Sequence, residues 1–273
     1  MRFGNNKRNM VRNIISIGLF LFFLLLTTSS SSGPHKSTRN QVRKIVIDAG
    51  HGGHDPGTSG NFSREKDVAL KIALELGSTI EKHLKDVEVI YTRDDDKFID
   101  LDVRAEIANK KNADLFVSIH CNAFPKKHIY GTETYVLGTH KTKANLEVAK
   151  RENSVILMED DYKNRYEGFD PKSPDSHILF QLYQNAFLEN SLDLAARIEN
   201  QLSTRAGRHS RGVKQAGFWV LWRTSMTAVY VETGYLSNPT EEKDLNDEVQ
   251  QSYIASAIFR AIRDYKQDME SSN

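Results

Sequence analysis

Apolar residues recur at two different spacings along residues 43–268, and the two spacings alternate. Short apolar runs closed by glycine or polar residues are typical of buried strands, and stripes that return every three to four positions are typical of amphipathic helices. The first pattern predicts strands over 44–48, 87–92, 114–120, 132–137 and 227–232. The second predicts helices over 65–84, 100–110, 191–206 and 253–265.

This alternation of strands and helices predicts the fold class. Consecutive strand–helix units favour parallel neighbours in one sheet, with the helices packed on its two faces. We therefore expect an α/β fold in a single three-layer domain, with a mixed, mainly parallel sheet and helices on both faces. We assign this domain to residues 43–268 and regard 269–273 as a short tail.

Residues 150–190 interrupt the alternation. The stretch is rich in Glu, Asp, Asn and Tyr, and it contains Pro171 and Pro174. A segment of this length between core elements is usually a functional lid, a binding loop or a partly disordered insertion. We treat it as an insertion in the domain.

The N-terminus has a different pattern. Four basic residues within the first twelve positions precede an apolar run at 14–26 and a serine tract. This order is typical of a secretory signal, which we assign to 1–32, followed by a linker at 33–42. No Ala-x-Ala site follows the run, so removal of the signal and its retention as an anchor both stay open. We expect an exported protein of the periplasm or cell envelope.

The amino-acid composition limits the classes of partner and the covalent cross-links that we expect for this chain. Lys and Arg total 37 against 36 Asp and Glu, a net charge of +1, so nothing in the charge balance favours a nucleic-acid partner. We expect the chain to act as a monomer. A single cysteine, Cys121, excludes an intramolecular disulfide, so the fold must be stabilised by its core and by any bound metal.

Histidine and acidic residues lie at the ends of predicted strands. His51 follows the first strand in a glycine-rich loop, His120 ends the third, and Glu232 ends the last. Glu65 begins the helix that follows the glycine-rich loop. Since the carboxyl ends of strands line the ligand crevice of open α/β sheets, we expect these side chains to converge. Two imidazoles and a carboxylate suit zinc, and a remaining carboxylate suits a general base, for which Glu232 is the candidate.

Spacing alone leaves the metal site open. The chain has no His-Glu-x-x-His pair of the kind found in zinc peptidases. A histidine near a strand end is more often a hydrogen-bonded structural residue than a ligand. Both interpretations stand at this stage.

Five segments carry a more specific pattern: IVIDAGHGGHDPGTSG (45–60), REKDVALKIA (64–73), VIYTRDDD (89–96), LFVSIHCNAF (115–124) and VYVETGYLSNPTEEKDL (229–245). In this order they resemble the zinc-dependent N-acetylmuramoyl-L-alanine amidases of the Amidase_3 family, in particular its AmiA/AmiB/AmiC-like cell-separation members. The resemblance spans nearly the whole predicted domain. It implies hydrolysis of the amide between N-acetylmuramic acid and L-alanine in peptidoglycan, during cell division and daughter-cell separation.

The resemblance also implies roles for individual residues. The family's zinc ligands fall on His51, Glu65 and His120, and its catalytic glutamate falls on Glu232. Asn122 lies two positions after His120 and is a candidate for substrate contact. The family commonly has a small residue where Cys121 stands. Because neighbouring side chains on a strand point to opposite faces, we expect Cys121 to be buried and reduced rather than a ligand.

Cell-separation members of the family carry an insertion that folds as a helix over the zinc and blocks it. Residues 150–190 occupy the corresponding place, and within them an apolar run at 155–158 precedes Glu159. We expect Glu159 to cap the open zinc position, and release of the block to need a partner with a LytM-like domain. The alternative is a solvated acidic surface with a small hydrophobic anchor.

Two other functions are alternatives to the amidase. A zinc peptidase acting on the peptide stems would use the same chemistry in a different pocket. A non-catalytic wall-binding activator would have no use for a free base at Glu232 beside a complete ligand set. Pocket shape, which one sequence does not reveal, separates the first alternative from the amidase.

Overall fold

The computed structural model describes residues 41–178, 180 and 186–271. The predicted signal at 1–32, nearly all of the predicted linker at 33–42, six residues of the predicted insertion and the end of the tail lie outside the described residues. Within the described part, no helix combines the length and the apolar character that crossing a membrane requires.

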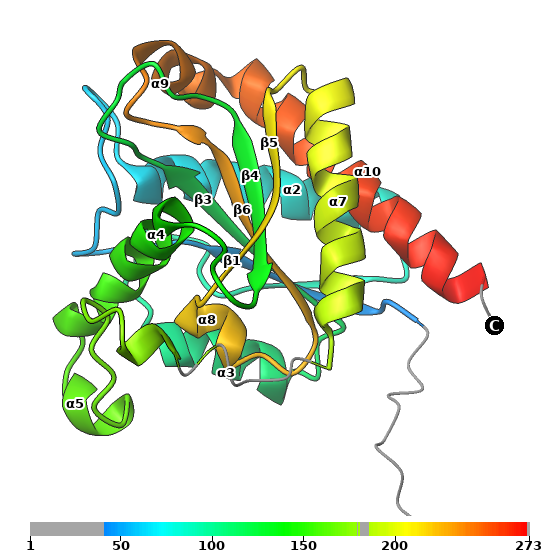
Figure 1. The fold of residues 1–273 in the computed structure, drawn as a ribbon. Coiled ribbons are helices and arrows are strands. Elements are labelled where there is room, and N and C mark those ends of the chain that lie inside the picture. The colour runs from blue at the N-terminus through cyan, green and yellow to red at the C-terminus, as the bar shows by residue number, and fades with distance from the viewer. Residues whose placement is uncertain (1–40, 179, 181–185, 272–273) are drawn as a thin grey trace, which may run out of the picture. The chain divides into compact units, whose positions relative to one another are not determined.

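A six-stranded sheet lies at the centre of the described domain (Figure 1). Its strands are β1 (Lys44–Ala49), β2 (Glu88–Tyr91), β3 (Leu115–Asn122), β4 (Thr132–Leu137), β5 (Ser210–Ala216) and β6 (Thr227–Tyr235), in the spatial order β2-β1-β3-β6-β4-β5. The first four strands of this order pair in parallel, β4 runs antiparallel to β6, and β5 runs parallel to β4. The predicted mixed, mainly parallel sheet is confirmed.

Helices cover both faces of the sheet (Figure 1). One face packs against α2 (Glu65–His83), α7 (Leu188–Thr204) and α10 (Glu248–Ser271), whose buried aliphatic residues share one core with alternate residues of the strands. The other face packs against α3 (Leu101–Lys110), α4 (Lys143–Asn153) and α8 (Trp219–Trp222) through a second, more aromatic core. A further helix, α9 (Pro239–Asn246), follows β6. The three-layer prediction is therefore confirmed.

The predicted insertion at 150–190 starts on a helix that the sequence pattern did not predict. α4 begins before position 150, where the Thr142 side chain accepts a hydrogen bond from the Asn145 N–H at 3.2 Å and caps the first turn. Short helices follow it: η1 (Ser154–Met158), α5 (Tyr162–Arg165) and η2 (Ser176–Ile178). Val155 and Ile156 are both buried, and Ile156 belongs to the core on the α3 and α8 side, so it anchors this region to the sheet.

Strand register brings the candidate site residues to one edge of the sheet. Ala49 at the end of β1 pairs with Ile119 in β3, and the next residue of β3, His120, pairs with Glu232 in β6. Residues that follow β1 and residues near the ends of β3 and β6 therefore meet at the carboxyl edge of the parallel strands, where ligand sites of such sheets form.

Candidate metal centre

His51 is held in position by the loop that follows β1. Its backbone has φ 59°, in the left-handed region that few non-glycine residues adopt. The Arg104 guanidinium donates to the His51 carbonyl at 2.7 Å, and Asp55 Oδ2 lies 2.6 Å from His51 Nδ1. A Cβ atom at position 50 would lie 2.1 Å from the His120 ring. Only glycine therefore lets the loop pass this close to β3. The loop thus fixes both the ring and its approach to β3.

Glu65 is the first residue of α2 and is fully buried. Its Oε2 accepts a hydrogen bond from the Thr58 N–H at 2.8 Å, and its Oε1 accepts one from the Cys121 N–H at 2.9 Å. A carboxylate in the first turn is also favoured by the helix dipole. These contacts orient the Glu65 carboxylate toward the two histidines.

His120 completes the predicted ligand set from β3. Its ring stacks on Tyr230 of β6, with centroids 4.0 Å apart and an angle of 21° between the planes. His120 Nδ1 lies 2.9 Å from Glu65 Oε1. The structure therefore brings His51, Glu65 and His120 together from three separate segments of the chain.

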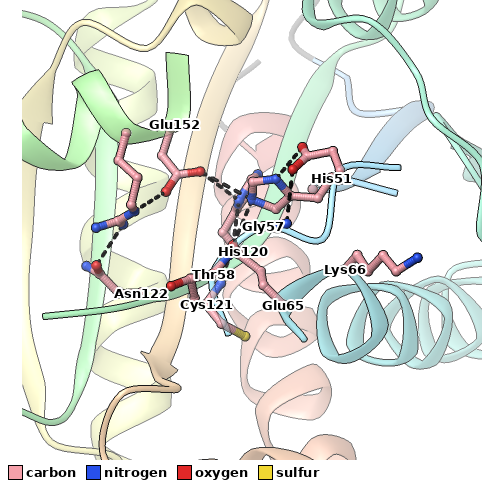
Figure 2. A network of polar contacts seen from close by, with 12 residues as sticks. His51, Gly57, Thr58, Glu65, Lys66, His120, Cys121, Asn122 and Glu152 are labelled. Atoms are coloured by element: carbon pink, nitrogen blue, oxygen red, sulfur yellow. Dashed lines mark hydrogen bonds and ion pairs between the residues drawn. The ribbon is translucent and has the colours of Figure 1, made fainter. Parts of the chain in front are cut away.

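A fourth residue, Glu152, joins the same cluster from the last turn of α4 (Figure 2). Glu152 Oε2 lies 3.3 Å from His51 Nε2 and 3.5 Å from His120 Nδ1. One ligand atom from each of the four residues lies within 4.8 Å of every other. The Tyr230 hydroxyl donates to Glu152 Oε2 at 2.7 Å and steadies it there.

These four residues fit a zinc ion. His51 Nε2 is buried and has no hydrogen-bond partner among the described residues, whereas its Nδ1 is held by Asp55, the arrangement that orients a metal-bound imidazole. Zinc bonds of about 2.0–2.1 Å in a tetrahedron separate neighbouring ligand atoms by roughly 3.3 Å. The separations between the histidine nitrogens and the two carboxylates run from 2.9 to 3.5 Å.

Electrostatics within the cluster favour a cation. Burial alone would lower the pKa of His51, but the charge of Glu65 and the hydrogen bond with Asp55 raise it well above its usual value. Burial likewise opposes ionisation of Glu65, yet His51 and His120 hold its pKa well below the usual range. The cluster therefore retains positive charge between its carboxylates, and a divalent ion can take the place of that charge.

Glu232 lies beside this cluster in a different environment. It is fully buried, and neither carboxylate oxygen has a hydrogen-bond partner within the described residues. Burial, followed by the charges of Glu152 and Glu65, raises its pKa well above the usual value, and Arg151, with Nη2 3.8 Å from Glu232 Oε1, only partly opposes this. Glu232 is therefore a carboxyl group that readily holds a proton next to the candidate metal position.

The structure corrects the residue predicted to cap the metal. Glu159 lies away from the cluster: its Oε1 accepts a hydrogen bond from the Leu101 N–H at 2.9 Å, and its Oε2 accepts one from the Tyr166 hydroxyl. The turn of η1 buries Val155 and Ile156 and directs Glu159 to the start of α3 instead. The carboxylate from the insertion that joins the histidines is that of Glu152.

The two remaining residues singled out from the sequence lie on β3 beside His120. Asn122 is buried; its Nδ2 donates to Glu133 Oε2 at 3.2 Å and its Oδ1 accepts from Arg151 Nη2 at 2.9 Å. Its amide thus links the insertion to β4. Cys121 is a buried free cysteine with its Sγ 3.3 Å from Thr233 Oγ1, as its position on the strand predicted. Burial raises the pKa of the Cys121 thiol well above its usual value.

Comparisons with known proteins point to one family. The family model for N-acetylmuramoyl-L-alanine amidases, Amidase_3, matches residues 45–264. The amidase AmiC of Escherichia coli O6:H1 is 36% identical over 245 residues, covering 88% of this chain and 56% of its own. The amidase AmiA of Escherichia coli K12 is 34% identical over 245 residues, covering 89% of this chain and 82% of its own.

Solved structures give the same result. The amidase from Clostridium difficile 630 superposes with a TM-score of 0.63 at 28% identity, covering 83% of this chain and 98% of its own. The CwlD amidase from Clostridioides difficile, solved in complex with the GerS lipoprotein, gives 0.61 at 28% identity, with 83% and 99% covered. The chain spans little more than half the length of the AmiC relative but most of the length of these solved domains. With its motifs, fold and candidate site in agreement, the chain belongs to the Amidase_3 family of N-acetylmuramoyl-L-alanine amidases.

Proposed function

We propose that this chain is an exported, zinc-dependent hydrolase that cleaves the amide between N-acetylmuramic acid and L-alanine in peptidoglycan. The observation that carries the proposal is the meeting of His51, Glu65 and His120 ligand atoms beside the buried carboxyl of Glu232, which accepts no hydrogen bond from the described residues. Family membership supports the peptidoglycan amide as the substrate. The cell-separation role rests on the resemblance of the sequence motifs to the AmiA/AmiB/AmiC-like members and belongs to the same proposal.

The residues divide the chemistry between them. His51, Glu65 and His120 would hold zinc, which when bound supplies Lewis acidity that polarises a carbonyl and acidifies water. Water adds to the amide carbon while Glu232 takes its proton. The carbon–nitrogen bond then breaks, and Glu232 returns the proton to the leaving nitrogen of L-alanine. A raised pKa suits Glu232 to hold that proton between the two steps.

The same proposal includes autoinhibition by α4. With zinc bound, Glu152 Oε2 would occupy a ligand position that water and substrate need, and the neighbouring Arg151 contacts Asn122. Burial opposes ionisation of Glu152, but the adjacent Arg151 charge holds its pKa down at about 2, so the cap stays anionic. Release would require α4 to leave, for which we propose a partner protein with a LytM-like domain. The GerS complex of CwlD is an example of a related domain that is bound by another protein.

Analysis of the new ends formed on purified sacculi tests the activity. The zinc-loaded protein carrying Glu152→Gln, which weakens the proposed block by α4, should free L-alanine amino groups and form no reducing sugars, and a chelator should stop the reaction. Glu232→Gln should abolish turnover and leave bound zinc unchanged, because Glu232 is not one of the three ligands.

The alternatives give different products in the same assay. A stem peptidase would free amino groups of later stem residues, and a wall-binding activator would release nothing. Either result would reject the amidase proposal if the protein is folded, zinc-loaded and carries Glu152→Gln to weaken the proposed block by α4.

A further inference from the structure

Polar side chains continue from Glu232 across the next two strands of the sheet. Glu133 of β4 lies directly opposite Glu232 of β6 in the antiparallel register. Glu133 is buried, and it accepts hydrogen bonds from the hydroxyls of Tyr135 at 2.6 Å and Tyr235 at 2.5 Å. Asn122, beside the metal cluster, also donates to it. The candidate active site is therefore connected through Glu133 to the outer part of the sheet.

Two cations on the edge strand β5 bind the same carboxylate. Arg211 Nε donates to Glu133 Oε1 at 2.8 Å, and Lys214 Nζ donates to the same oxygen. Although burial opposes ionisation, Lys214 holds the pKa of Glu133 below its usual value. One negative charge therefore faces two positive charges, which leaves an excess of one positive charge at this point.

A bulge in β5 is what places both cations on the face that carries the site. Residues three apart on a regular strand point to opposite faces. Here Thr132 pairs with Ser210, but Thr134 pairs with Val213, so β5 holds one residue more than β4 across this interval. The bulged Gly212 has φ 84°, a conformation that favours glycine. The extra residue turns Lys214 to the same side as Arg211.

The cations remain reachable while α4 covers the metal cluster. The side chains of Arg211 and Lys214 are 32% and 21% exposed, whereas their shared partner Glu133 is 2% exposed. Their charged groups lie over tyrosine rings: Arg211 Cζ is 5.6 Å from the Tyr235 ring centre, and Lys214 Nζ is 5.8 Å from the Tyr135 ring centre. The charged ends are thus fixed in direction and accessible to solvent.

We propose that Arg211 and Lys214 form an anion subsite that binds a carboxylate of the peptide stem on the leaving side of the scissile amide. The inference rests on the proposed amidase function and adds a substrate preference to it. Neighbouring strands are about 4.8 Å apart, so β5 lies roughly 10 Å from Glu232 on β6. An extended peptide covers that distance in about three residues. The carboxylate therefore belongs to the first acidic residues after L-alanine.

Kinetics with two muropeptides test the subsite. They differ only in the second stem residue, which carries either a free carboxylate or a carboxamide. With the zinc-loaded protein carrying Glu152→Gln, KM for the carboxylate form should be about tenfold lower at similar kcat, because paired cations bind a carboxylate through charge-assisted hydrogen bonds. When the same protein also carries Arg211→Gln and Lys214→Gln, the two muropeptides should have the same KM.

Two controls keep the kinetic result interpretable. Removing both cations leaves the buried Glu133 carboxylate without a positively charged partner. Lys214→Gln alone keeps Arg211 on Glu133, so this single variant is measured beside the double variant. It should lose part of the preference for the carboxylate muropeptide. Lys110→Gln removes a lysine that is 72% exposed on α3 and should change neither constant. Equal KM values for the two muropeptides with the Glu152→Gln protein that retains both cations would overturn the subsite.

Binding separates this inference from the amidase proposal. The zinc-loaded chain carrying Glu232→Gln is titrated calorimetrically with the stem tripeptide, in its carboxylate and carboxamide forms, without any sugar. Tighter binding of the carboxylate form that is weakened by Lys214→Gln supports the subsite even where sacculi are not cut, a result that would reject the amidase proposal alone. Equal binding of both forms, or binding of neither, overturns the subsite even where sacculi are cut.

Discussion

Glu152 Oε2 lies 3.3 Å from His51 Nε2, although one residue ends a helix of the insertion and the other follows the first strand. The contact joins the insertion to the candidate metal ligands directly rather than through a distant surface. Movement of α4 would therefore change the number of protein ligands available to a metal bound by the histidines. Under the proposed autoinhibition, Glu152 would control both access to the metal and its reactivity.

Glu152→Gln should raise the initial rate on purified sacculi by about tenfold or more. A neutral amide is a weaker zinc ligand than a carboxylate, and coupling free energies of this kind are typically worth 5–150-fold. Glu147→Gln serves as the matched control, since Glu147 lies on the same helix with its side chain 56% exposed. A folded, zinc-loaded Glu152→Gln protein that is no faster than its parent would exclude autoinhibition by this residue.

Zinc should stabilise the folded chain as well as activate it. Zinc that binds only the native state, at a free concentration about 1,000-fold above Kd, adds about 4 kcal/mol to the free energy of unfolding. In a domain of this size that corresponds to roughly 10 °C in Tm. His120→Ala should lower bound zinc well below one ion per chain, measured by atomic absorption, and its Tm should respond little to zinc. An unchanged metal content in His120→Ala would remove His120 from the ligand set.

Much of the site follows from strand patterning, because the carboxyl ends of neighbouring parallel strands must lie at one edge of the sheet. His120 and Glu232 lie near the carboxyl ends of strands whose residues are all buried, so their positions could be predicted from apolar runs. His51 follows β1, which is buried from Ile45 onward. The fold class was predictable for the same reason.

Other parts depend on packing that the pattern does not contain. β5 has intermediate or exposed residues at most positions and Gly212 at its bulge, so it lacks both the apolar run and the alternation of a predictable strand. Glu152 was missed because α4 buries few apolar residues, Val148 and Ala149 among them, and no helix was predicted there. The apolar run beside Glu159 was a real anchor, but it directs that carboxylate to α3.

Arg104 should be essential for stability although it has no role in the chemistry. Its Nη1 donates to Asp48 Oδ1 at 2.9 Å and to the Ala49 carbonyl at 2.7 Å, and its Nη2 holds the His51 carbonyl. Arg104→Met leaves buried Asp48 without its cation, a change that typically costs about 3–5 kcal/mol. Denaturant unfolding measures this loss, with Lys110→Met on the exposed side of the same helix as the control. A loss below about 1 kcal/mol would contradict the structural role.

The contact of the insertion with α3 should weaken as pH rises. Burial, assisted by the nearby Asp100 charge, raises the pKa of Glu159 to about 7, against the hydrogen bonds from Tyr166 and the Leu101 N–H. When the segment detaches, this carboxyl returns to a pKa of about 4.3. Between these two values the docked form binds more protons than the detached form, so docking loses stability from about pH 4.3 up to about pH 7 and levels off above it.

Hydrogen exchange measures this dependence on the segment itself. Amides of residues 159–166, corrected for intrinsic rates, should exchange faster at pH 7.5 than at pH 5. Glu159→Gln should remove most of the difference, because an amide keeps the contacts without titrating. Glu167→Gln, at an exposed neighbouring position, should retain it. Equal protection at the two pH values in the parent protein, or an undiminished difference in Glu159→Gln, would show that Glu159 does not set the pH response of the insertion.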